Sequence, residues 1–572
     1  MMSSYYYIAD PGRAEAALQQ LYSTPAPYGI DIETTGLCPW QHQLRLVSIA
    51  NWAGTVVVLD MLHLPAALLT EWLARGWYVA HNAVFESKWF RRVAGVQINV
   101  HDTMLLGRVL YGASLSLEKL CAQALGLQVD KAAQRSDWAA PALTAQQLAY
   151  SALDAQLPLQ LYERIGPIAG RTAIYQNLLQ VVPVIAQQEL DGIPVDWERL
   201  ERLRERWEWQ RLEALSAFDL ALPGVLPTSP KQISAWLETH ADALLLRQWP
   251  RTATGQLQLN SDQLNALQPG ALPALEPLRQ VRKLTKLLGW TKGNLLDKRN
   301  PVTGRVHPGY GIAFASSGRF NCSKPNMQQL PREGDMRELV CAPLGRALAC
   351  ADYSMQELRI SAIYSGERTM LDAFNAGTDL HTLTAQQVLG STDKEARAVG
   401  KTINFSQQYG GGPQVLVKKA RERGITLTLE QAQAYRTRFF ESRPQLRQWQ
   451  RHTISQAERT LQVSTRLGLV RHFTRDTFKA TDVCAHAVSG TGAEVLRSTL
   501  AALPRHLAGL DARLIHHSHD ELLLECAEQD GAAAAQGLAA AMLDGWVQVM
   551  GEQCTTGLVD AHTGATWAAA KG

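Results

Sequence analysis

The chain reads Ala-Leu-Ala-Cys-Ala-Asp-Tyr-Ser-Met-Gln-Glu-Leu-Arg over residues 347–359 and Leu-Ile-His-His-Ser-His-Asp-Glu-Leu-Leu-Leu-Glu over residues 514–525. Each stretch is an apolar run that ends at an aspartate, Asp352 in the first and Asp520 in the second. A tight turn at His519-Asp520 predicts that the second stretch is a hairpin. One such aspartate alone is usually a strand cap. If the hairpin lies beside the first strand, however, the two carboxylates meet and can hold two Mg²⁺ ions.

Between these two strands, a helix with one unusual face is predicted. It reads Arg-Ala-Val-Gly-Lys-Thr-Ile-Asn-Phe-Ser-Gln-Gln-Tyr from residue 397, and three glycines follow. Arg397, Lys401, Phe405 and Tyr409 recur every four positions, and each step drifts by only about 40°, so all four share one broad face. The cations suit a triphosphate, with Lys401 near the developing charge of the transferred phosphoryl group, and the rings suit a base and a sugar. The three glycines are expected to end the helix.

Composition sets broad limits on the class of protein. The 572 residues suffice for roughly three to five domains, and 46% hydrophobic against 19% charged residues allows full cores. The net charge of +3 is nearly neutral, so contacts to phosphates need basic residues gathered locally. Basic runs at residues 279–286 and 418–423 either serve that purpose or are solvated helix faces.

The cysteines and the apolar runs indicate where in the cell the protein is expected. Eight cysteines without a CxxC pair indicate reduced thiols in a cytosolic protein and no zinc site. The N-terminus lacks a signal-peptide pattern, and no apolar run approaches about 18–20 residues, so no membrane is expected as a partner. The predicted location is the cytoplasm, that of the host cell if a phage encodes the protein.

The first third has the pattern of an α/β domain with acidic residues on a strand. Residues 28–37 alternate as a strand, which places Asp31 and Glu33 on the same face. The apolar runs 44–50 and 55–59 are separated by a short turn and predict a hairpin.

Further acidic residues follow on two predicted helices. Residues 78–86 predict a strand that leads into a helix carrying Glu86. Thr144 is a plausible N-cap for a later helix. On that helix Tyr150 and Asp154 are four residues apart and therefore share a face.

Such a set of carboxylates suits phosphodiester hydrolysis. That reaction uses two metal ions about 3.5–4 Å apart, and Mg²⁺ prefers carboxylate oxygens. A single Asp-x-Glu is usually a surface strand, but the whole set is far more specific. The Tyr150 hydroxyl is expected to position the water, and the expected metal ligands are Asp31, Glu33, Glu86 and Asp154.

This set resembles the proofreading 3′–5′ exonucleases of the DEDD type with a tyrosine. The matching stretches are Asp31-Ile-Glu33-Thr-Thr-Gly, His81-Asn82-Ala-Val-Phe85-Glu86, Ser136-Asp137-Trp138 and Tyr150-x-x-x-Asp154. The family usually carries Asp at the position of Glu86, whose carboxylate reaches about one methylene further. Activity is expected to survive this change. A proofreading role fits better than RNA processing because of the second half of the chain.

The middle of the chain predicts a helical arm. A long polar helix is expected over residues 197–221, and residues 275–295 suggest another. The arm is either a helical spacer or a projection whose Lys and Arg grip duplex phosphates without reading sequence. It resembles a polymerase thumb.

The second half is similar to the family A, polymerase I-like DNA polymerases of phage or plasmid replicative type. The motifs that carry the resemblance are Asp352-Tyr-Ser-x-x-Glu357-Leu-Arg, Arg397-x-x-x-Lys401-x-x-Asn404-Phe405-x-x-x-Tyr409-Gly410 and His519-Asp520-Glu521, supported by Ser317-Gly318-Arg319-Phe320, Pro325-Asn326-Met-Gln328, Asp379-Leu-His381 and Gly490-Thr491-Gly492. The resemblance runs from about residue 28 to Trp567. It leaves no room ahead of it for the 5′-nuclease domain that polymerase I also carries.

The resemblance implies a fold of α/β and α+β domains. A ribonuclease H-like exonuclease domain is expected first, followed by a right-hand polymerase with palm, fingers and thumb. The expected boundaries are 1–170 for the exonuclease domain, 171–300 for the start of the palm and the helical thumb, 301–365 for the palm with Asp352, 366–505 for the fingers and 506–572 for the palm with Asp520.

The resemblance also implies roles for individual residues. Two Mg²⁺ ions per active site are expected, for which Mn²⁺ can substitute, bound in the polymerase site by Asp352 and Asp520 with the catalytic Glu521 close by. The triphosphate is expected at Arg397, Lys401 and His381, and the nucleotide pocket at Phe405, Tyr409, Met355 and Gln356. Glu357 crowds the 2′ position of the sugar and excludes ribonucleotides. The minor groove of primer and template is expected at Arg319, Asn326, Gln328, Ser489 and His519.

Four positions depart from the family pattern near the inserted base pair. Met355 and Gln356 replace Gln-Ile, Ser406 replaces a glycine, and Ser489 replaces a glutamine. They lie where the family checks base-pair geometry. One hypothesis is that the pocket accepts a modified base such as 2-aminoadenine.

The predicted function is therefore template-directed DNA synthesis with 3′–5′ proofreading, in phage or mobile-element replication. The expected partners are primer–template DNA and dNTPs, the expected state is a monomer, and no replisome or processivity partner is identified. One alternative is a single-subunit RNA polymerase, against which Glu357 and the exonuclease segment argue. The others are a catalytically inactive nucleic-acid clamp and an exonuclease with a degenerate, DNA-binding polymerase half. Intact Asp352, Lys401 and Asp520 argue against both.

Overall fold

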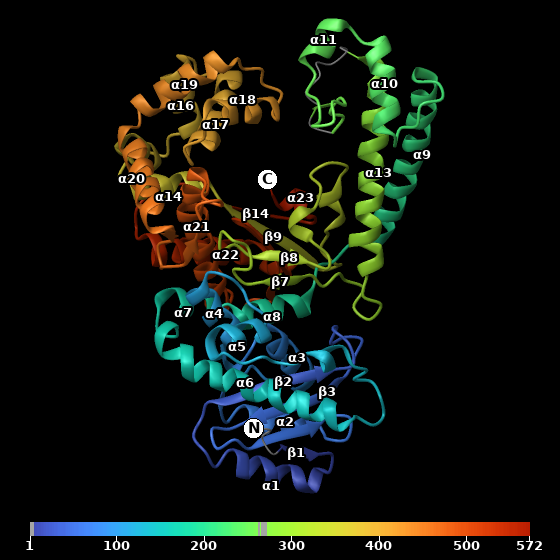
Figure 1. The fold of residues 1–572 in the computed structure, drawn as a ribbon, viewed down its shortest axis with the longest axis vertical. Helices are drawn as coiled ribbons and strands as arrows, with labels where there is room; N and C mark the ends of the chain where they lie inside the picture. Colours follow the sequence, from blue (N-terminus) through green and yellow to red (C-terminus); the bar gives the residue numbers. More distant parts are fainter. Residues whose placement is uncertain (1–4, 261–262, 265–271, 572) are drawn as a thin grey trace.

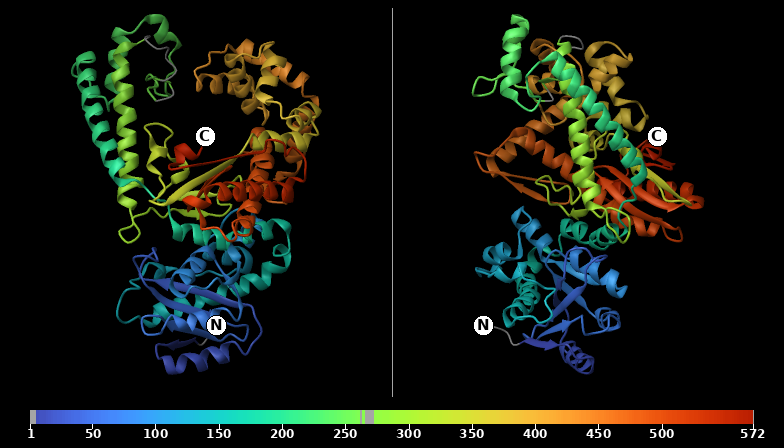
Figure 2. Two further views of the ribbon diagram at one scale, coloured as in Figure 1. Left: turned by 180° about the vertical axis from the view of Figure 1, so that it is seen from behind. Right: turned by 90° about the vertical axis from the view of Figure 1, so that its right-hand side faces the viewer.

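The structure is a computed structural model that describes residues 5–260, 263–264 and 272–571. It has three parts, seen in Figures 1 and 2: an N-terminal unit around a six-stranded sheet, a central unit around a four-stranded sheet, and two helical arms that rise on either side of the central sheet. No helix in the described ranges has the length and apolar character that a membrane span requires.

The N-terminal sheet has the strand order β1-β4-β3-β2-β5-β6. Its strands are β1 Tyr5–Ile8, β2 Tyr28–Thr34, β3 Leu44–Ala50, β4 Val56–Asp60, β5 Trp77–Ala80 and β6 Asn99–Asp102. The expected hairpin of β3 and β4 is confirmed, and β2 pairs antiparallel to β3. Every residue of β3 and β4 is buried, so both faces of these strands are covered.

Helices cover this sheet and bring the later acidic residues to it. They are α1 Pro11–Leu21, α2 Ala67–Leu73, α3 Val84–Ala94, α4 Thr103–Tyr111, α5 Leu117–Leu125 and α6 Ala145–Ala169. The predicted cap at Thr144 is confirmed as a capping box with Gln147. Helix α6 crosses β2 at Gly29, where a Cβ atom would come within 1.9 Å of the Ala155 carbonyl oxygen. This close approach requires glycine and sets the acidic residues of β2 near those of α6.

The first arm leaves the N-terminal unit through two short helices. The helices of this region are α7 Ala173–Leu179, α8 Val182–Asp191, α9 Trp197–Ala221, α10 Pro230–His240, α11 Ala243–Gln248 and α13 Glu276–Asn294. The predicted helix over residues 197–221 is confirmed as α9, which packs along α13 (Figure 2). Its buried residues Leu200, Leu203 and Trp207 lie at helical spacing on the packed side.

The central sheet has the strand order β12-β13-β9-β14. Its strands are β9 Arg346–Tyr353, β12 Ala512–Ser518, β13 Glu521–Ala527 and β14 Val559–Gly564. The expected hairpin is confirmed as β12 and β13, and β13 lies antiparallel beside β9. Two small hairpins accompany this sheet, β7 Gly309–Gly311 with β8 Asn321–Ser323, and β10 Gln462–Ser464 with β11 Val470–His472.

Helices back the central sheet and form the second arm. The sheet is accompanied by α14 Gln356–Ser365, α21 Ala480–His506, α22 Gly531–Met550 and α23 Trp567–Ala570, and the arm contains α15 Arg368–Asn375, α16 Leu380–Leu389, α17 Lys394–Gln407, α18 Pro413–Arg421, α19 Leu429–Glu441 and α20 Pro444–Thr460. Short 3₁₀ turns complete the chain, at η1 Ala132–Arg135, η2 Pro273–Leu275, η3 Leu296–Lys298, η4 Met327–Gln329, η5 Met336–Leu339 and η6 Glu528–Asp530.

Helix α17 ends earlier than predicted. Tyr409 was expected on the helix, but it lies in the turn after Gln407. Gly410 adopts a positive φ of 77°, and its N–H donates to the Gln407 carbonyl at 2.9 Å. The helix therefore ends before Gly410, because residues in the left-handed conformation commonly terminate helices.

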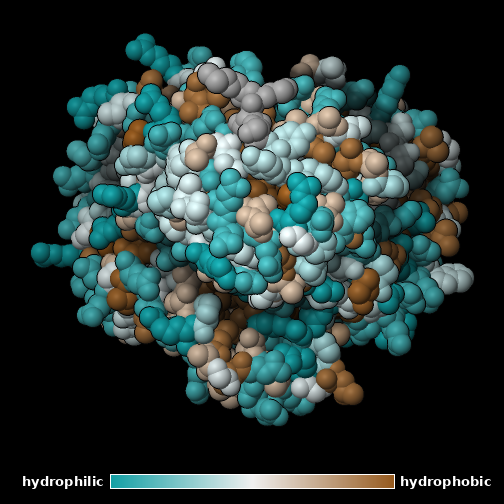
Figure 3. Space-filling view, turned by 90° about the horizontal axis from the view of Figure 1, so that it is seen from below, coloured by the Kyte–Doolittle hydropathy of each residue, from teal (hydrophilic) through white to brown (hydrophobic). Residues whose placement is uncertain are grey.

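The surface at the end that carries the N-terminal unit is mainly hydrophilic (Figure 3). Hydrophobic side chains there are scattered among polar ones. Scattered apolar residues of this kind are usual on a protein surface and point to no docking face.

Two candidate active sites

The N-terminal unit gathers four carboxylates around the edge of β2. Asp31 and Glu33 come from β2, Glu86 from the first turn of α3 and Asp154 from α6. Burial first, and then the charges of Asp31 and Asp154, raise the pKa of Glu33 to about 10. Burial and the neighbouring Asp154 also raise the pKa of Asp31, and burial and Asp31 raise that of Glu86. These like charges face one another closely enough to oppose each other's ionisation.

Lys131 belongs to this cluster, although the sequence did not indicate it. Its ammonium donates to Asp154 Oδ2 at 2.6 Å and to the Tyr150 hydroxyl at 3.1 Å. It lies 4.9 Å from the centroid of the Tyr150 ring. Its place shortly before the Ser136-Asp137-Trp138 stretch is the only local signal that sequence reasoning could have used.

The donor atoms of this cluster suit a hard cation. Glu86 Oε2 and Asp154 Oδ1 are buried without a hydrogen-bond partner in the described structure. Carboxylate oxygens are the ligands that Mg²⁺ prefers. As the described side chains stand, however, no three His, Cys, Asp or Glu residues form a group that could hold a metal ion. The chemistry of the donors therefore fits the expected cofactor, whereas metal-binding geometry is not formed.

The central sheet brings Asp352 and Asp520 together. Strand pairing sets Asp352 opposite Glu521, and the Tyr353 N–H donates to the Asp520 carbonyl at 3.1 Å. His519 occupies the turn with a positive φ of 58°. Burial and the Asp352 charge raise the pKa of Asp520 to about 6. The two aspartates thus share one end of the sheet, as the apolar runs predicted.

A second lysine lies on these carboxylates. The Lys571 ammonium donates to Asp352 Oδ2 at 3.0 Å and to Glu521. Trp567 Nε1 donates to the other Glu521 oxygen at 2.5 Å. Burial opposes the charge of Lys571, but its bonds to Glu521 and Asp352 outweigh burial and raise the pKa of the ammonium. No local pattern in the sequence indicates this residue.

A cavity of about 430 Å³ opens beside the two aspartates. It contains most of the residues expected around the nucleotide. The predicted residues that line it are Asp352, Asp520, His519, Met355, Gln356, Glu357, His381, Lys401, Phe405 and Arg319. An adjoining cavity of about 410 Å³ shares Arg319, Glu357 and Phe405 and adds Tyr409 and Ser489, together with the cations Lys419, Arg423 and Arg471.

Four residues predicted for the polymerase site line neither cavity, and one of them is Glu521, which Lys571 and Trp567 contact. Arg397 is half-exposed and pairs with Asp379, with Nε 2.7 Å from Oδ2. Gln328 donates to the His517 carbonyl at 3.3 Å, and Asn326 Oδ1 is buried without a partner among the described residues.

His381 lines the cavity, and its neighbours indicate which ring nitrogen carries the proton. Burial, aided by Lys401, lowers the pKa of its imidazole to about 4, so the ring is neutral at physiological pH. Asn404 Nδ2 lies 3.0 Å from Nδ1, and Asn404 Oδ1 accepts from Thr384. An Nδ1 that accepts from Asn404 leaves the proton on Nε2, which suits a phosphate oxygen.

Glu357 is the most heavily bonded residue of the cavity. Its carboxylate accepts from the Tyr409 hydroxyl, from Ser489 Oγ at 2.6 Å and from Gln408 Nε2 at 3.1 Å, and it pairs with Arg319. These contacts hold the Glu357 side chain from both sides.

The departures after Asp352 also have structural partners. Met355 begins α14 with a positive φ of 53° and lines the cavity. Gln356 is buried against α21, where a Cβ on Gly492 would come within 2.6 Å of Gln356 Oε1. The Gln356 side chain therefore packs against the Gly492 backbone in space that a larger residue at position 492 would fill.

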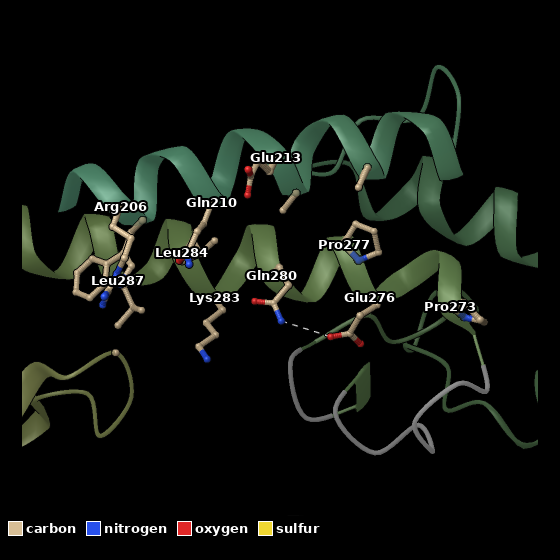
Figure 4. Close-up of a pocket in the computed structure, with 14 residues that line it drawn as sticks. Arg206, Gln210, Glu213, Pro273, Glu276, Pro277, Gln280, Lys283, Leu284 and Leu287 are labelled. Atoms are coloured by element: carbon tan, nitrogen blue, oxygen red, sulfur yellow. Dashed lines mark hydrogen bonds between the residues drawn. The ribbon is translucent and has the colours of Figure 1, made fainter. Parts of the chain in front are cut away.

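The first arm holds a third cavity, of about 830 Å³, along α9 and α13. Lys283, Gln280 and Glu276 project from α13 there (Figure 4). Lys283 belongs to the basic run 279–286, whereas no residue predicted as catalytic, nucleotide-binding or DNA-binding lines this cavity. Of the basic run on α13, Arg279 and Arg282 donate to the carbonyls of Leu264 and Leu259. Those two arginines hold the arm together internally.

Comparison with known proteins places the chain in a family. Residues 198–569 match DNA polymerase family A, and residues 5–169 match a 3′-5′ exonuclease family. The chain therefore belongs to DNA polymerase family A and carries a 3′–5′ exonuclease domain. The predicted fold class and enzyme class, a DNA-directed DNA polymerase with an exonuclease domain, are confirmed at this level.

The similar proteins are bacterial. The chain is 29% identical over 557 residues to DNA polymerase I of Aquifex aeolicus, which covers 92% of this chain and 93% of that protein. It is 31% identical over 462 residues to DNA polymerase I of Pseudomonas aeruginosa and 31% identical over 381 residues to the thermostable DNA polymerase I of Thermus aquaticus, covering 75% and 63% of this chain. It spans only 50% and 44% of those two relatives.

A solved structure shares the fold. The POL domain of Pol1 from M. smegmatis, in complex with DNA primer-template and dNTP, superposes with a TM-score of 0.84 at 23% identity and full coverage of both chains. At this identity the likeness concerns the fold.

Proposed function

We propose that this protein extends a primer 3′ end with dNTPs along a template and edits its own errors with the exonuclease domain. The observation that carries the proposal is the strand pairing that brings Asp352 and Asp520 to one cavity with Lys401 and His381. Under this proposal α9–α13 act as thumb, α15–α20 as fingers and the four-stranded sheet as palm. The enzyme works as a monomer on primer–template DNA.

Five side chains of the polymerase cavity have a defined task in this proposal. Lys401 and the Nε2–H of His381 bind the triphosphate, while Glu357 closes the space beside the 2′ carbon of the sugar. Asp352 and Asp520 would hold two Mg²⁺ ions, and Mn²⁺ can substitute. When bound, such ions stabilise charge on the transferred phosphoryl group.

In the exonuclease site the proposed work is shared by six residues. Tyr150 orients a water molecule, and Lys131 holds both the Tyr150 hydroxyl and Asp154 in place. The remaining carboxylates, Asp31, Glu33 and Glu86, would bind the metal ions together with Asp154.

We also propose phage or mobile-element replication as the setting and altered base selection as a specialisation. Support for the specialisation comes from Ser489, which replaces the expected glutamine and bonds directly to Glu357 and Tyr409. A side chain this short leaves the minor-groove side of the base pair with less contact.

The test is extension of a labelled primer with Mg²⁺ and either dNTPs or rNTPs. Asp352→Ala should abolish extension and keep degradation of single strands, and Asp31→Ala should do the reverse. Asp511→Ala, an exposed aspartate paired with Arg346, is the matched control. Extension by Asp352→Ala would refute the polymerase site. A wild-type chain that only degrades would instead favour the exonuclease with a degenerate polymerase half.

A further inference from the structure

Arg108 is a buried arginine of the exonuclease domain that reaches into the polymerase domain. It belongs to α4 and is 1% exposed, and α4 lies at the side of its unit that faces the central sheet (Figure 1). Its Nε donates to the Ala313 carbonyl at 2.9 Å and its Nη2 to the Ala315 carbonyl at 3.4 Å. Within the described chain no carboxylate pairs with it, and Nη1 has no partner. Its contacts are therefore with two backbone oxygens of the other domain.

These two carbonyls belong to a turn region of residues 312–319. The Gly318 N–H donates to the Ala315 carbonyl at 2.8 Å, and the Ala315 N–H donates to the Arg319 carbonyl at 3.3 Å. Ala313 has a positive φ of 52°, which a residue with a Cβ adopts only at a cost of about 1–2 kcal/mol. From α21, Arg497 Nη1 donates to the Gly318 carbonyl at 2.7 Å. Two buried arginines thus hold a strained turn from two sides.

The turn leads directly to Arg319. The Arg319 guanidinium pairs with Glu357, which also accepts from Tyr409 and Ser489. A path of direct contacts therefore runs from α4, through the turn, to the centre of the nucleotide cavity. Ser317 belongs to this turn and lines the cavity, and only Gly318 separates it from Arg319. A shift of the turn would therefore move Arg319 as well.

The guanidinium is a costly way to seal a domain interface. Burial, with the charge of Arg471 nearby, lowers the pKa of Arg108 to about 10. An apolar side chain of similar volume usually fills a buried site at lower cost than a charge. The end of α4 is already packed, since a Cβ on Gly112 would come within 2.9 Å of the His472 ring. The particular value of arginine here is its rigid fork, which can bind two carbonyls at once.

We propose that Arg108 is a positioning residue of the polymerase site, through which the exonuclease domain fixes the turn that aims Arg319 at Glu357. The inference rests on the proposed function, because it takes the cavity at Glu357 as the dNTP site. It makes nucleotide insertion depend on a residue outside the polymerase domain.

The kinetic test uses Arg108→Met and Arg108→Lys, with Arg75→Met as the control. Arg75 is an exposed arginine of the same domain that pairs with Glu71. Arg108→Met should lower kcat/KM for correct dNTP insertion by roughly 10- to 100-fold, because small misplacements in a site are expensive. Arg108→Lys should recover part of the loss with its single ammonium, and single-strand degradation should stay unchanged. Equal losses in both activities would overturn the proposal, because they indicate a general loss of structure.

A double-mutant cycle with Arg319→Ala tests the path. If Arg108 acts through Arg319, Arg108→Met should cause little further loss in kcat/KM once Arg319 is absent. The same loss with and without Arg319 would overturn the proposal.

A third measurement does not need catalysis. Hydrogen exchange in the peptide 312–320 should be faster in Arg108→Met than in the wild type, and unchanged in Arg75→Met. If the wild type fails to extend primers, the proposed function fails, and this measurement still decides whether Arg108 fixes the turn. Unchanged exchange in Arg108→Met would overturn the inference even in an active enzyme.

Discussion

The two acidic clusters of this chain have similar side chains in different surroundings. In the exonuclease site, burial and neighbouring carboxylates raise the pKa of Glu33 to about 10. In the polymerase site, burial and Asp352 raise the pKa of Asp520 only to about 6. The first cluster is thus strongly opposed to ionisation without added positive charge, whereas Asp520 in the second is opposed to it only weakly.

A lysine lies in each cluster, and the lysine of the exonuclease site is the more deeply buried of the two. The side chain of Lys131 is 17% exposed and that of Lys571 is 33% exposed. A buried cation is expected to be part of the folded structure, whereas a more exposed one is replaced more easily by another cation. The difference suggests that Lys131 stabilises the folded exonuclease site, whereas Lys571 competes with a metal ion for the carboxylates of the polymerase site.

The largest effect that tests this contrast is expected from Lys131→Met. The substitution leaves a buried carboxylate cluster without its ammonium, which typically costs about 3–5 kcal/mol. Urea denaturation in EDTA at neutral pH should show this loss in the free energy of unfolding. Lys119→Met, an exposed lysine of the same domain, is the control. A loss of unfolding free energy below about 1 kcal/mol, the usual value for surface ion pairs, would mean that Lys131 contributes no more to stability than an exposed lysine.

The pH dependence of stability should also differ between the sites. Glu33 has a folded pKa of about 10 against an ordinary value of 4.5, so the folded state keeps a proton that the unfolded state releases. Its contribution to stability is full below the ordinary pKa and is lost as the pH rises toward 10. For Asp520 the corresponding window runs only from 3.8 to about 6.

Thermal unfolding in EDTA across this pH range measures the difference. Glu33→Gln should flatten the decline of the melting temperature between pH 6 and 10, where Asp520→Asn should leave it unchanged. An equal slope in the wild type and Glu33→Gln would show that the Glu33 carboxylate titrates normally.

What the sequence could predict depended on how local each signal was. The apolar runs around Asp352 and Asp520 predicted the central strands and their pairing, and Thr144 predicted a helix start, because strand ends and caps are local features. Lys131 and Lys571 were missed. They lie 23 and 219 residues from the aspartates they contact, and nothing near either lysine repeats or alternates. Only the folded chain brings these charges together.

A smaller effect is expected from Lys571→Met. Because Lys571 occupies Asp352 and Glu521, its removal should favour Mg²⁺ binding at the polymerase site. A partly exposed pair contributes up to about 1 kcal/mol, so the Mg²⁺ concentration for half-maximal extension should fall by about fivefold or less. Calorimetric titration of Mg²⁺ without dNTP gives a readout apart from activity. An unchanged or higher Mg²⁺ requirement in Lys571→Met would show that Lys571 does not compete with Mg²⁺. Lys131→Met is the comparison and should not change the Mg²⁺ requirement of extension.

The last prediction concerns insertion against removal, and it requires the exonuclease site to be silenced. In an Asp31→Ala background, insertion of 2-aminoadenine triphosphate opposite thymine should exceed that of dATP by roughly two- to tenfold, about the value of one further hydrogen bond. Ser489→Gln introduces the expected glutamine beside Glu357 and Tyr409 and should reduce that preference. Single-nucleotide kcat/KM values decide the matter, and equal efficiency or a preference for dATP would reject altered base selection. Repeating the measurement with Asp31 intact then shows whether the editing site removes either nucleotide preferentially.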